Sequence, residues 1–279
     1  MEPIDYLVLG HVTHDLLPDG ARGIGGTASY AALTAAALGR RVGVLTSAGA
    51  DFDAGLLERI AQVTLLRAPA TTTFENRYID GQRQQFWYTT ALPLILALLP
   101  GVWQGTPLVH IGPVAGECDP ALVAHFAGRT FVGLTPQGWM RRADASKRVL
   151  RTPWADAERL LPLASAAVLS IEDVAGDWEI AHRFARWAKT LVITQGREGA
   201  RLFVEGKPQA IAAPAVVELD PTGAGDIFAS AFFIALSGGA EPEPAAHFAT
   251  CLAARSVTRP GLDAAPRPSD IAACTQHLS

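Results

Sequence analysis

Short apolar runs alternate with helical segments along most of this chain. The runs have the length and composition of buried strands, and they occupy 4–9, 42–45, 63–66, 108–111, 130–134, 167–169 and 191–194. Helices are expected at 27–38, 52–60, 224–236, 245–257 and 269–277. Strands that alternate with helices form mainly parallel sheets covered on both faces. We therefore expect an α/β fold with three αβα layers, in a single domain over 1–279.

Two β segments stand apart from this alternation. Residues 71–89 place β-branched and aromatic residues on both sides of Asp80-Gly81, a strong signal for a tight hairpin turn. These runs are rather polar, so we expect the hairpin to lie outside the main core as a flap. The runs 201–204 and 209–212, which flank Gly206, predict a second hairpin.

Composition excludes several classes of function. Hydrophobic residues make up 49% of the chain and charged residues 18%, so a large core can form. The net charge is −4 and there is no basic run, which disfavours nucleic acid as a partner. The apolar run 91–99 is too short to span a bilayer, and we expect it to be buried or to cover a face. No basic, cleavable leader begins the sequence, so we expect a cytoplasmic protein without a membrane partner.

The three cysteines, Cys118, Cys251 and Cys274, are far apart and form no CxxC pair. This spacing predicts reduced thiols rather than a disulfide framework or a zinc site.

The stretch DPTGAGDIFAS, 220–230, is the strongest candidate for a site. Gly223, Ala224 and Gly225 have small or no side chains, Asp226 follows them, and an apolar helical run comes next. Such a stretch can be a tight turn with an acid favoured by the helix dipole. It can also be an anion hole, because free N–H groups at a helix start bind phosphate. With Asp226 able to accept a proton from a hydroxyl, the second interpretation predicts phosphoryl transfer to an alcohol.

This stretch resembles the C-terminal signature of the ribokinase-like family, the phosphofructokinase-B type carbohydrate kinases. The signature reads Asp-Thr-x-Gly-Ala-Gly-Asp before an apolar helix, and Pro221 is the departure from it here. The resemblance extends over about 4–261. It implies a ribokinase-like αβα sandwich with a small β-hairpin lid contributed by about 12–24 and 70–90.

The resemblance assigns roles to the signature. Asp226 becomes the catalytic base, and the N–H groups of Gly223, Ala224 and Gly225 hold the transferring phosphoryl group. ATP and Mg²⁺ are the implied cofactors. Asp220 would belong to a neighbouring monovalent-cation loop that binds K⁺ in many members, although Pro221 removes one N–H there.

The resemblance also assigns the nucleotide side. Thr194, Gly196 and Gly199 match a Thr-x-Gly-x-x-Gly segment that lines the nucleotide pocket, although a simple turn has the same pattern. Thr250 falls on the adenine-side helix where Asn is frequent in the family, and an ordinary core helix explains that segment equally well.

A metal site is implied next to the nucleotide. Ser170 and Asp173 stand at the ends of the family's Asn-x-x-Glu motif, with Ser170 on the nucleotide side, and Glu172 lies alongside. Carboxylate oxygens suit Mg²⁺, which usually keeps several waters. Which of Glu172 and Asp173 faces the metal is open, and helix capping is the alternative role for these acids.

The acceptor side begins after the first strand. Asp15 matches the family's acceptor-binding Asp, and Gly25-Gly26 match its N-terminal glycine pair. Tyr30 stands where family members that phosphorylate ribose or fructose usually carry Asn, and Thr27 stands where ribokinases carry Lys, which disfavours ribose. His11 and His14 lie nearby, but a histidine near a strand end is more often structural than catalytic.

Further acceptor residues come from the flap and from 135–144. We expect Asn76, Gln137 and Arg141 to bind the acceptor, with a solvated flap as the alternative for 71–84. The segments HDLLPDG, GGTASY and PQGWMR resemble the myo-inositol kinase branch. That branch implies a small, neutral, hydroxyl-rich acceptor.

The sequence thus predicts an ATP-dependent kinase that phosphorylates a hydroxyl on a small polyol or sugar, with a myo-inositol-like acceptor favoured. A nucleoside kinase is the first alternative, with Tyr30, Phe86 or Trp87 stacking on the base. A catalytically silent ligand-binding protein on the same fold is the second. We expect a monomer or a homodimer paired through the lid. No G-x-G-x-x-G follows the first strand and no P-loop motif is present, which argues against dinucleotide-binding and P-loop proteins.

Overall fold

The structure, a computed structural model, describes residues 2–79 and 82–278. Within these residues one sheet is built from β1 (Tyr6–Leu9), β4 (Val42–Ala48), β5 (Ala61–Arg67), β8 (Leu108–Ile111), β9 (Phe131–Leu134), β12 (Ala166–Ser170), β13 (Thr190–Thr194), β14 (Ala200–Val204) and β15 (Lys207–Ile211). Its order is β15-β14-β13-β12-β9-β8-β1-β4-β5. Neighbours from β13 to β5 run parallel, and the β14–β15 hairpin adds an antiparallel edge. The predicted mainly parallel sheet is confirmed.

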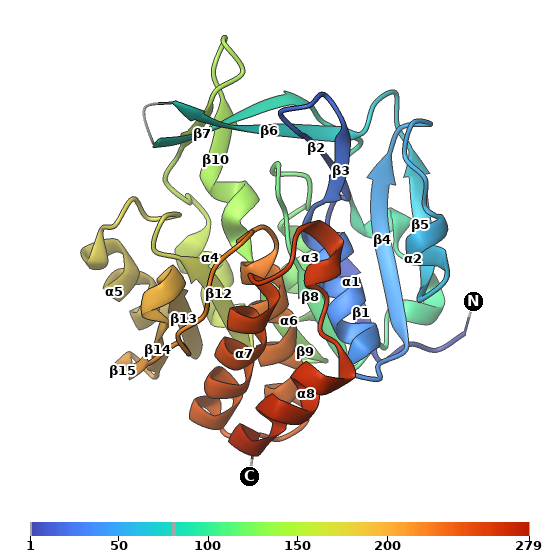
Figure 1. Cartoon of the computed structure of the whole chain (residues 1–279). Helices are drawn as coiled ribbons and strands as arrows, with labels where there is room; N and C mark the ends of the chain where they lie inside the picture. Colours follow the sequence, from blue (N-terminus) through green and yellow to red (C-terminus); the bar gives the residue numbers. More distant parts are fainter. Residues whose placement is uncertain (1, 80–81, 279) are drawn as a thin grey trace.

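Helices cover both faces of this sheet (Figure 1). One face carries α1 (Thr27–Ala37), α2 (Gly55–Glu58), α6 (Ala224–Ser237), α7 (Pro242–Ser256) and α8 (Pro268–Thr275). The other carries α3 (Ala121–Phe126), α4 (Ala157–Leu160) and α5 (Trp178–Trp187). Tyr6 and Val8 belong to the first core and Leu7 and Leu9 to the second, because successive side chains of a strand point to opposite faces. The three-layer αβα prediction is confirmed.

A second sheet lies across the edge where the parallel strands end (Figure 1). Its order is β3-β2-β6-β7, with β2 at Thr13–Leu16, β3 at Arg22–Gly25, β6 at Thr72–Ile79 and β7 at Gln82–Thr89. A small ribbon of β10 (Arg141–Ala143) and β11 (Val149–Arg151) joins it, because the Trp87 N–H donates to the Lys147 carbonyl at 2.8 Å. The predicted turn at Asp80-Gly81 lies outside the described residues. That this sheet closes as a lid or pairs two subunits stays a prediction.

Two local expectations differ from the structure. The helix expected over 52–60 is reduced to α2, since Asp53 already accepts the Gly55 N–H in a turn. The run 91–99 is divided: Leu94 and Leu99 are buried, whereas Leu92 and Ile95 are each 40% exposed. Pro93 and Pro100 keep this run from forming a regular helix, and it contains only a short 3₁₀ turn, Leu96–Leu98. Among the described residues, no helix has the length and apolar character needed to cross a membrane.

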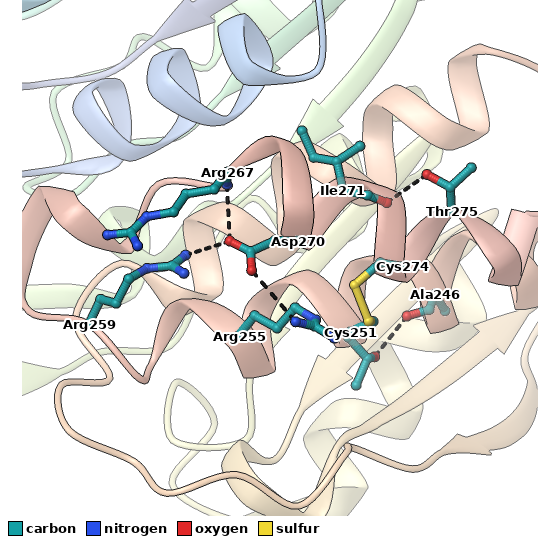
Figure 2. Close-up of a disulfide and its surroundings, with 10 residues drawn as sticks. Ala246, Cys251, Arg255, Arg259, Arg267, Asp270, Ile271, Cys274 and Thr275 are labelled. Carbon is teal, nitrogen blue, oxygen red and sulfur yellow. Dashed lines mark hydrogen bonds and ion pairs between the residues drawn. A yellow bond between two sulfur atoms is a disulfide. The ribbon is translucent and has the colours of Figure 1, made fainter.

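The expectation of three reduced thiols is wrong for two of them. Cys251 of α7 and Cys274 of α8 form a disulfide with a Cα–Cα separation of 5.7 Å (Figure 2). Cys118 is buried and free, and its thiol donates to the Leu9 carbonyl. Sequence spacing could not show the pairing, because it depends on how α8 packs back on α7.

The disulfide closes a loop with a sequence separation of 23 residues. Cross-linking a loop of this size removes entropy from the unfolded chain, so the Cys251→Ser/Cys274→Ser variant should lose about 3 kcal/mol of unfolding free energy. Urea unfolding with and without a reductant checks this. The reductant should destabilise the wild type and leave the double variant unchanged; equal sensitivity of both would contradict the disulfide.

Candidate active site

The carboxyl ends of the parallel strands bring the predicted site residues to one edge of the sheet. Gly10 follows β1, Thr135 follows β9, Asp173 follows β12 and Gln195 follows β13. In open parallel sheets, ligands bind in the crevice outside these strand ends. The start of α6, which carries Asp226, packs against α1 at the same edge.

The N-terminal turn of α6 has the backbone of an anion-binding site. Gly223 is the N-cap, with φ of 79°, and a Cβ there would lie 2.3 Å from the ring of Tyr30. Only glycine therefore fits this turn. The Ala224 N–H donates to the Pro221 carbonyl at 3.2 Å, so this predicted anion-hole amide is already engaged. Across the described residues, the Gly225 and Asp226 N–H groups have no partner in the protein, and nothing lies within 4 Å of a Cβ at Gly225.

Asp226 is a partly buried carboxylate with an altered acidity. Burial raises its pKa to about 6, and the nearby charges of Asp173 and Asp15 act in the same direction. The Thr27 hydroxyl, which donates to Oδ1 at 2.7 Å, and the charge of Arg141 oppose this rise. A pKa near 6 leaves the group mostly ionised at neutral pH and still able to take a proton, which suits a general base.

Asp173, rather than Glu172, faces this site. Asp173 is 9% exposed, whereas Glu172 lies on the surface. The Asp173 carboxylate accepts the Ser170 N–H at 2.8 Å and the Gln137 amide at 3.3 Å, and it pairs with Arg141 at 3.7 Å. Gln137, Arg141 and Asp173 are thus brought together as one polar group.

The carboxylates at this site can be compared with the ligands that Mg²⁺ uses in proteins. In the part of the chain that the structure describes, no three His, Cys, Asp or Glu side chains gather as metal ligands. Mg²⁺ bound with a phosphate substrate commonly uses one or two protein carboxylates and several waters. Asp173, with the Ser170 hydroxyl beside it, fits that limited role. Asp220, which was expected in a monovalent-cation loop, accepts backbone N–H groups from Thr222 and Gly261, each at 2.9 Å, and its role there stays a prediction.

The second sheet contacts the same polar group. Asn76 of β6 accepts the Gln85 amide at 3.2 Å, and Gln85 of β7 accepts Arg141 Nη1 at 3.2 Å. A chain of polar contacts therefore runs from the sheet above the site, through Arg141, to Asp173. Asn76 was expected from the sequence; Gln85 was missed, and only its position across the hairpin from Asn76 could have indicated it.

Asp15 lies at the other side of the site. It sits in β2 opposite β3, and Thr13 donates to its Oδ1 at 3.3 Å. A Cβ at Gly25 would lie 2.4 Å from Asp15 Oδ2, so glycine is required for this close approach. Gly26 is the N-cap of α1 and directs the helix toward Asp226 through Thr27. Thr27 itself was not assigned a contact from the sequence.

Of the four residues matched to the nucleotide pocket, two lie at the strand end or the following turn, and two have a structural explanation. Thr194 ends β13, and Gly196 begins the following turn with open space at its Cβ position. A Cβ at Gly199 would lie 2.1 Å from the Ile211 carbonyl, so packing explains this glycine without a ligand. Thr250 is 5% exposed and donates to the Ala246 carbonyl of its own helix, which is the ordinary core-helix arrangement.

Of the residues proposed for base stacking, Tyr30 is buried, whereas Phe86 and Trp87 are partly exposed and have protein neighbours. Tyr30 is 2% exposed and its ring packs against Gly223. The Arg77 guanidinium lies 4.4 Å above the Phe86 ring. Trp87 packs on Phe74 and donates to the Thr89 carbonyl.

Both candidate histidines have structural contacts. His11 is fully buried, and its ring nitrogens contact the Thr72 hydroxyl and the Leu92 carbonyl. His14 pairs with Asp51 at 3.5 Å, and burial lowers the pKa of its ring.

Comparisons with known proteins identify kinases among the proteins to which this chain is similar. Residues 156–269 match the pfkB family carbohydrate kinase description. The cytidine kinase of Thermococcus kodakarensis is 27% identical over 85% of this chain and 90% of its own length. The inositol 3-kinase of Oryza sativa subsp. japonica is 28% identical over 94% of this chain and 70% of its own length.

The fold has close structural neighbours as well. The structure of a pyrophosphate-dependent kinase in the ribokinase family, complexed with a pyrophosphate analog and myo-inositol, superposes with a TM-score of 0.81. It is 23% identical, and the match covers 96% of this chain and 99% of that one. The fold is therefore ribokinase-like, and residues 156–269 match the pfkB carbohydrate kinase family, as the motifs predicted.

The bond between Thr27 and Asp226 can be tested without an activity assay. Thr27→Val keeps the side-chain shape and removes the hydroxyl that stabilises the carboxylate, so the pKa of Asp226 should rise above about 6. Carbon-13 NMR titration of the Asp226 carboxyl measures it. Thr34→Val, which removes a hydroxyl bonded to the Tyr30 carbonyl in the same helix, should leave this pKa unchanged.

Proposed function

We propose that this protein transfers a phosphoryl group from ATP to a hydroxyl of a small polyol or sugar, with a myo-inositol-like acceptor favoured. One observation carries the proposal. A carboxylate with a raised pKa, Asp226, lies at a helix start where the Gly225 and Asp226 N–H groups have no protein partner among the described residues. A base and an anion-binding backbone in one turn are the two groups that this reaction needs.

Different residues of this chain have different roles in the proposed reaction. The acceptor hydroxyl lies against Asp226, whose carboxylate takes the proton as the oxygen bonds to the transferring phosphorus. The backbone N–H groups at the start of α6 and the Arg141 guanidinium face the charge on the phosphoryl oxygens. The bond from phosphorus to the bridging donor oxygen breaks, and ADP leaves. Mg²⁺, when bound, neutralises donor phosphate charge, and Asp173 with Ser170 would hold it.

The polar groups around the base favour a polyol acceptor. Asp15, Asn76 and Gln137 present carboxylate and amide groups, which bind hydroxyls. Of the three aromatic residues that could stack on a nucleoside base, Tyr30 is buried, Arg77 lies over the Phe86 ring, and Phe74 packs on Trp87. The similarity to an inositol 3-kinase supports the polyol, while the similarity to a cytidine kinase keeps the nucleoside in the test.

Inorganic pyrophosphate is a second candidate for the donor. The Thr250 hydroxyl donates to a carbonyl of its own helix, and close packing explains why position 199 is a glycine. These two residues, which were expected at the nucleotide, therefore give no specific support for ATP as the donor. A structural neighbour is pyrophosphate-dependent. Pyrophosphate would use the same anion-binding turn and the same base, without a contact on the adenine side.

The test is product formation across acceptors and donors. Purified protein with Mg²⁺ is given myo-inositol, ribose, fructose, adenosine or cytidine, with either ATP or pyrophosphate, and phosphorylated product is measured by mass spectrometry. We expect product with myo-inositol and ATP, and a loss of about 10²–10⁴-fold in kcat for Asp226→Asn.

A stability control accompanies this variant. Asparagine removes a charge that burial disfavours, so Asp226→Asn should unfold at a temperature equal to or above that of the wild type at pH 8. Equal kcat for the variant and the wild type would overturn the role of Asp226. Product with cytidine or adenosine alone would replace the polyol by a nucleoside, and product with pyrophosphate alone would replace ATP.

The rate should also depend on pH in a defined direction. The base acts only when ionised, and the pKa of Asp226 is raised to about 6, so kcat/KM should rise with pH up to about 6 and then level off. Below this value the rate should fall about tenfold per pH unit. Initial rates between pH 4.5 and about 8.5 give the profile. A level profile across this range would show that another group sets the rate.

A further inference from the structure

One buried carboxylate holds together two loops at the acceptor side of the site. Glu117 is 4% exposed; its Oε1 accepts the His11 N–H at 2.8 Å, and its Oε2 accepts the Ala115 N–H at 2.7 Å. The Val114 N–H contacts both oxygens, at 3.1 and 3.0 Å. His11 lies 106 positions before Glu117 and leads into β2, which carries Asp15. Glu117 therefore joins the loop after β1 to the loop after β8.

The loop after β8, 112–115, lies against the partner of the proposed base. A Cβ at Gly112 would collide with the Thr27 methyl group and with the Thr135 hydroxyl. Thr27 is the residue whose hydroxyl donates to Asp226. The position of this loop therefore affects both the start of α1 beside the base and the chain that follows β9.

The same loop supports two further parts of the acceptor side. The Pro113 carbonyl accepts the Gly138 N–H at 2.8 Å, which fixes the chain next to Gln137. Val114 shares a small buried cluster with Phe74 of β6, so the second sheet also rests on this loop. Segments that are far apart in the sequence thus meet on four residues, and one carboxylate holds those residues in place.

The N–H groups around Glu117 require a carboxylate. It has two acceptor oxygens and no donor, so it can face three backbone N–H groups at once. The amide of a glutamine has one acceptor oxygen, and its NH₂ group would face another donor. Glu117→Gln should therefore keep the volume of the side chain and release part of the loop.

We propose that Glu117 is a positioning residue for the acceptor: it fixes the 112–115 loop, and through that loop it sets the second sheet relative to the strand ends. Asp15, Asn76 and Gln137, the groups proposed to bind the acceptor hydroxyls, lie on the segments that this loop holds. Glu117 therefore acts on acceptor binding, whereas the anion-binding turn of α6 serves the donor. This inference rests on the proposed phosphoryl transfer.

A selective change in KM tests this role. With the donor and acceptor that give product in the assay above, Glu117→Gln should raise the KM of the acceptor about 10-fold or more and leave the KM of the donor within about twofold of the wild type. Asp119→Asn is the matched control, because this exposed carboxylate of the same segment accepts the Ala121 N–H at the start of α3. It should keep both KM values. An unchanged acceptor KM for Glu117→Gln, or equal increases in both KM values, would overturn the role.

A second variant moves the loop without changing Glu117. A Cβ at Gly10 would collide with the Gly112 carbonyl, so Gly10→Ala should push the loop away from β1. It should also raise the acceptor KM alone, and it keeps the inference testable if Glu117→Gln does not fold. Gly105→Ala is its control, since nothing in the described part of the chain lies within 4 Å of a Cβ there. Equal acceptor KM values for the two glycine variants would contradict the role of the loop.

A measurement without catalysis keeps the two proposals apart. Hydrogen exchange at the Gly138 amide, which donates to the Pro113 carbonyl, should become faster in Glu117→Gln and not in Asp119→Asn. If no substrate is phosphorylated, the proposed function fails, and the exchange rate still decides whether Glu117 positions the chain beside Gln137. Unchanged exchange at this amide overturns the positioning role even if the enzyme is active.

Discussion

An ionised carboxylate at the start of an apolar helix is the constraint on which this site depends. From Ile227 to Ala235 the helix α6 is buried, so Asp226 has little water to stabilise its charge. The Thr27 hydroxyl and the positive end of the helix dipole stabilise the negative charge of Asp226 in place of solvent. Because Thr27 begins α1, the packing of α1 on α6 sets both the place and the acidity of the base. The contact between Tyr30 and Gly223 fixes the same two helices together.

The charges around Asp226 are coupled to the second sheet through Arg141. This arginine lowers the pKa of Asp226 and pairs with Asp173, while Gln85 of β7 holds its other nitrogen. A movement of β6 and β7 would therefore move a positive charge relative to the base. The predicted closure of this sheet over an acceptor would therefore change the electrostatics of the site as well as its access to water.

The sequence predicted what depends on local pattern. Apolar runs such as 42–45 became central strands, because a strand buried on both faces is mostly apolar. The turn at Gly223 was predicted from residues that are adjacent in the chain. Contacts between segments farther apart in the chain were not predicted: the Cys251–Cys274 disulfide and the bond from Thr27 to Asp226. Each depends on how helices pack, and residue spacing does not contain that information.

The energetics of Asp226 also distinguish an enzyme from a silent binding protein on this fold. Burial makes the ionised form costly, and an asparagine of the same size would avoid that cost. Binding a polyol does not require an ionisable group here, since an asparagine amide also forms hydrogen bonds with a hydroxyl. A base gains from it, because a pKa near 6 matches proton transfer at neutral pH. An ionisable group whose pKa is raised by burial, at a helix start that can bind phosphate, therefore favours catalysis over binding alone.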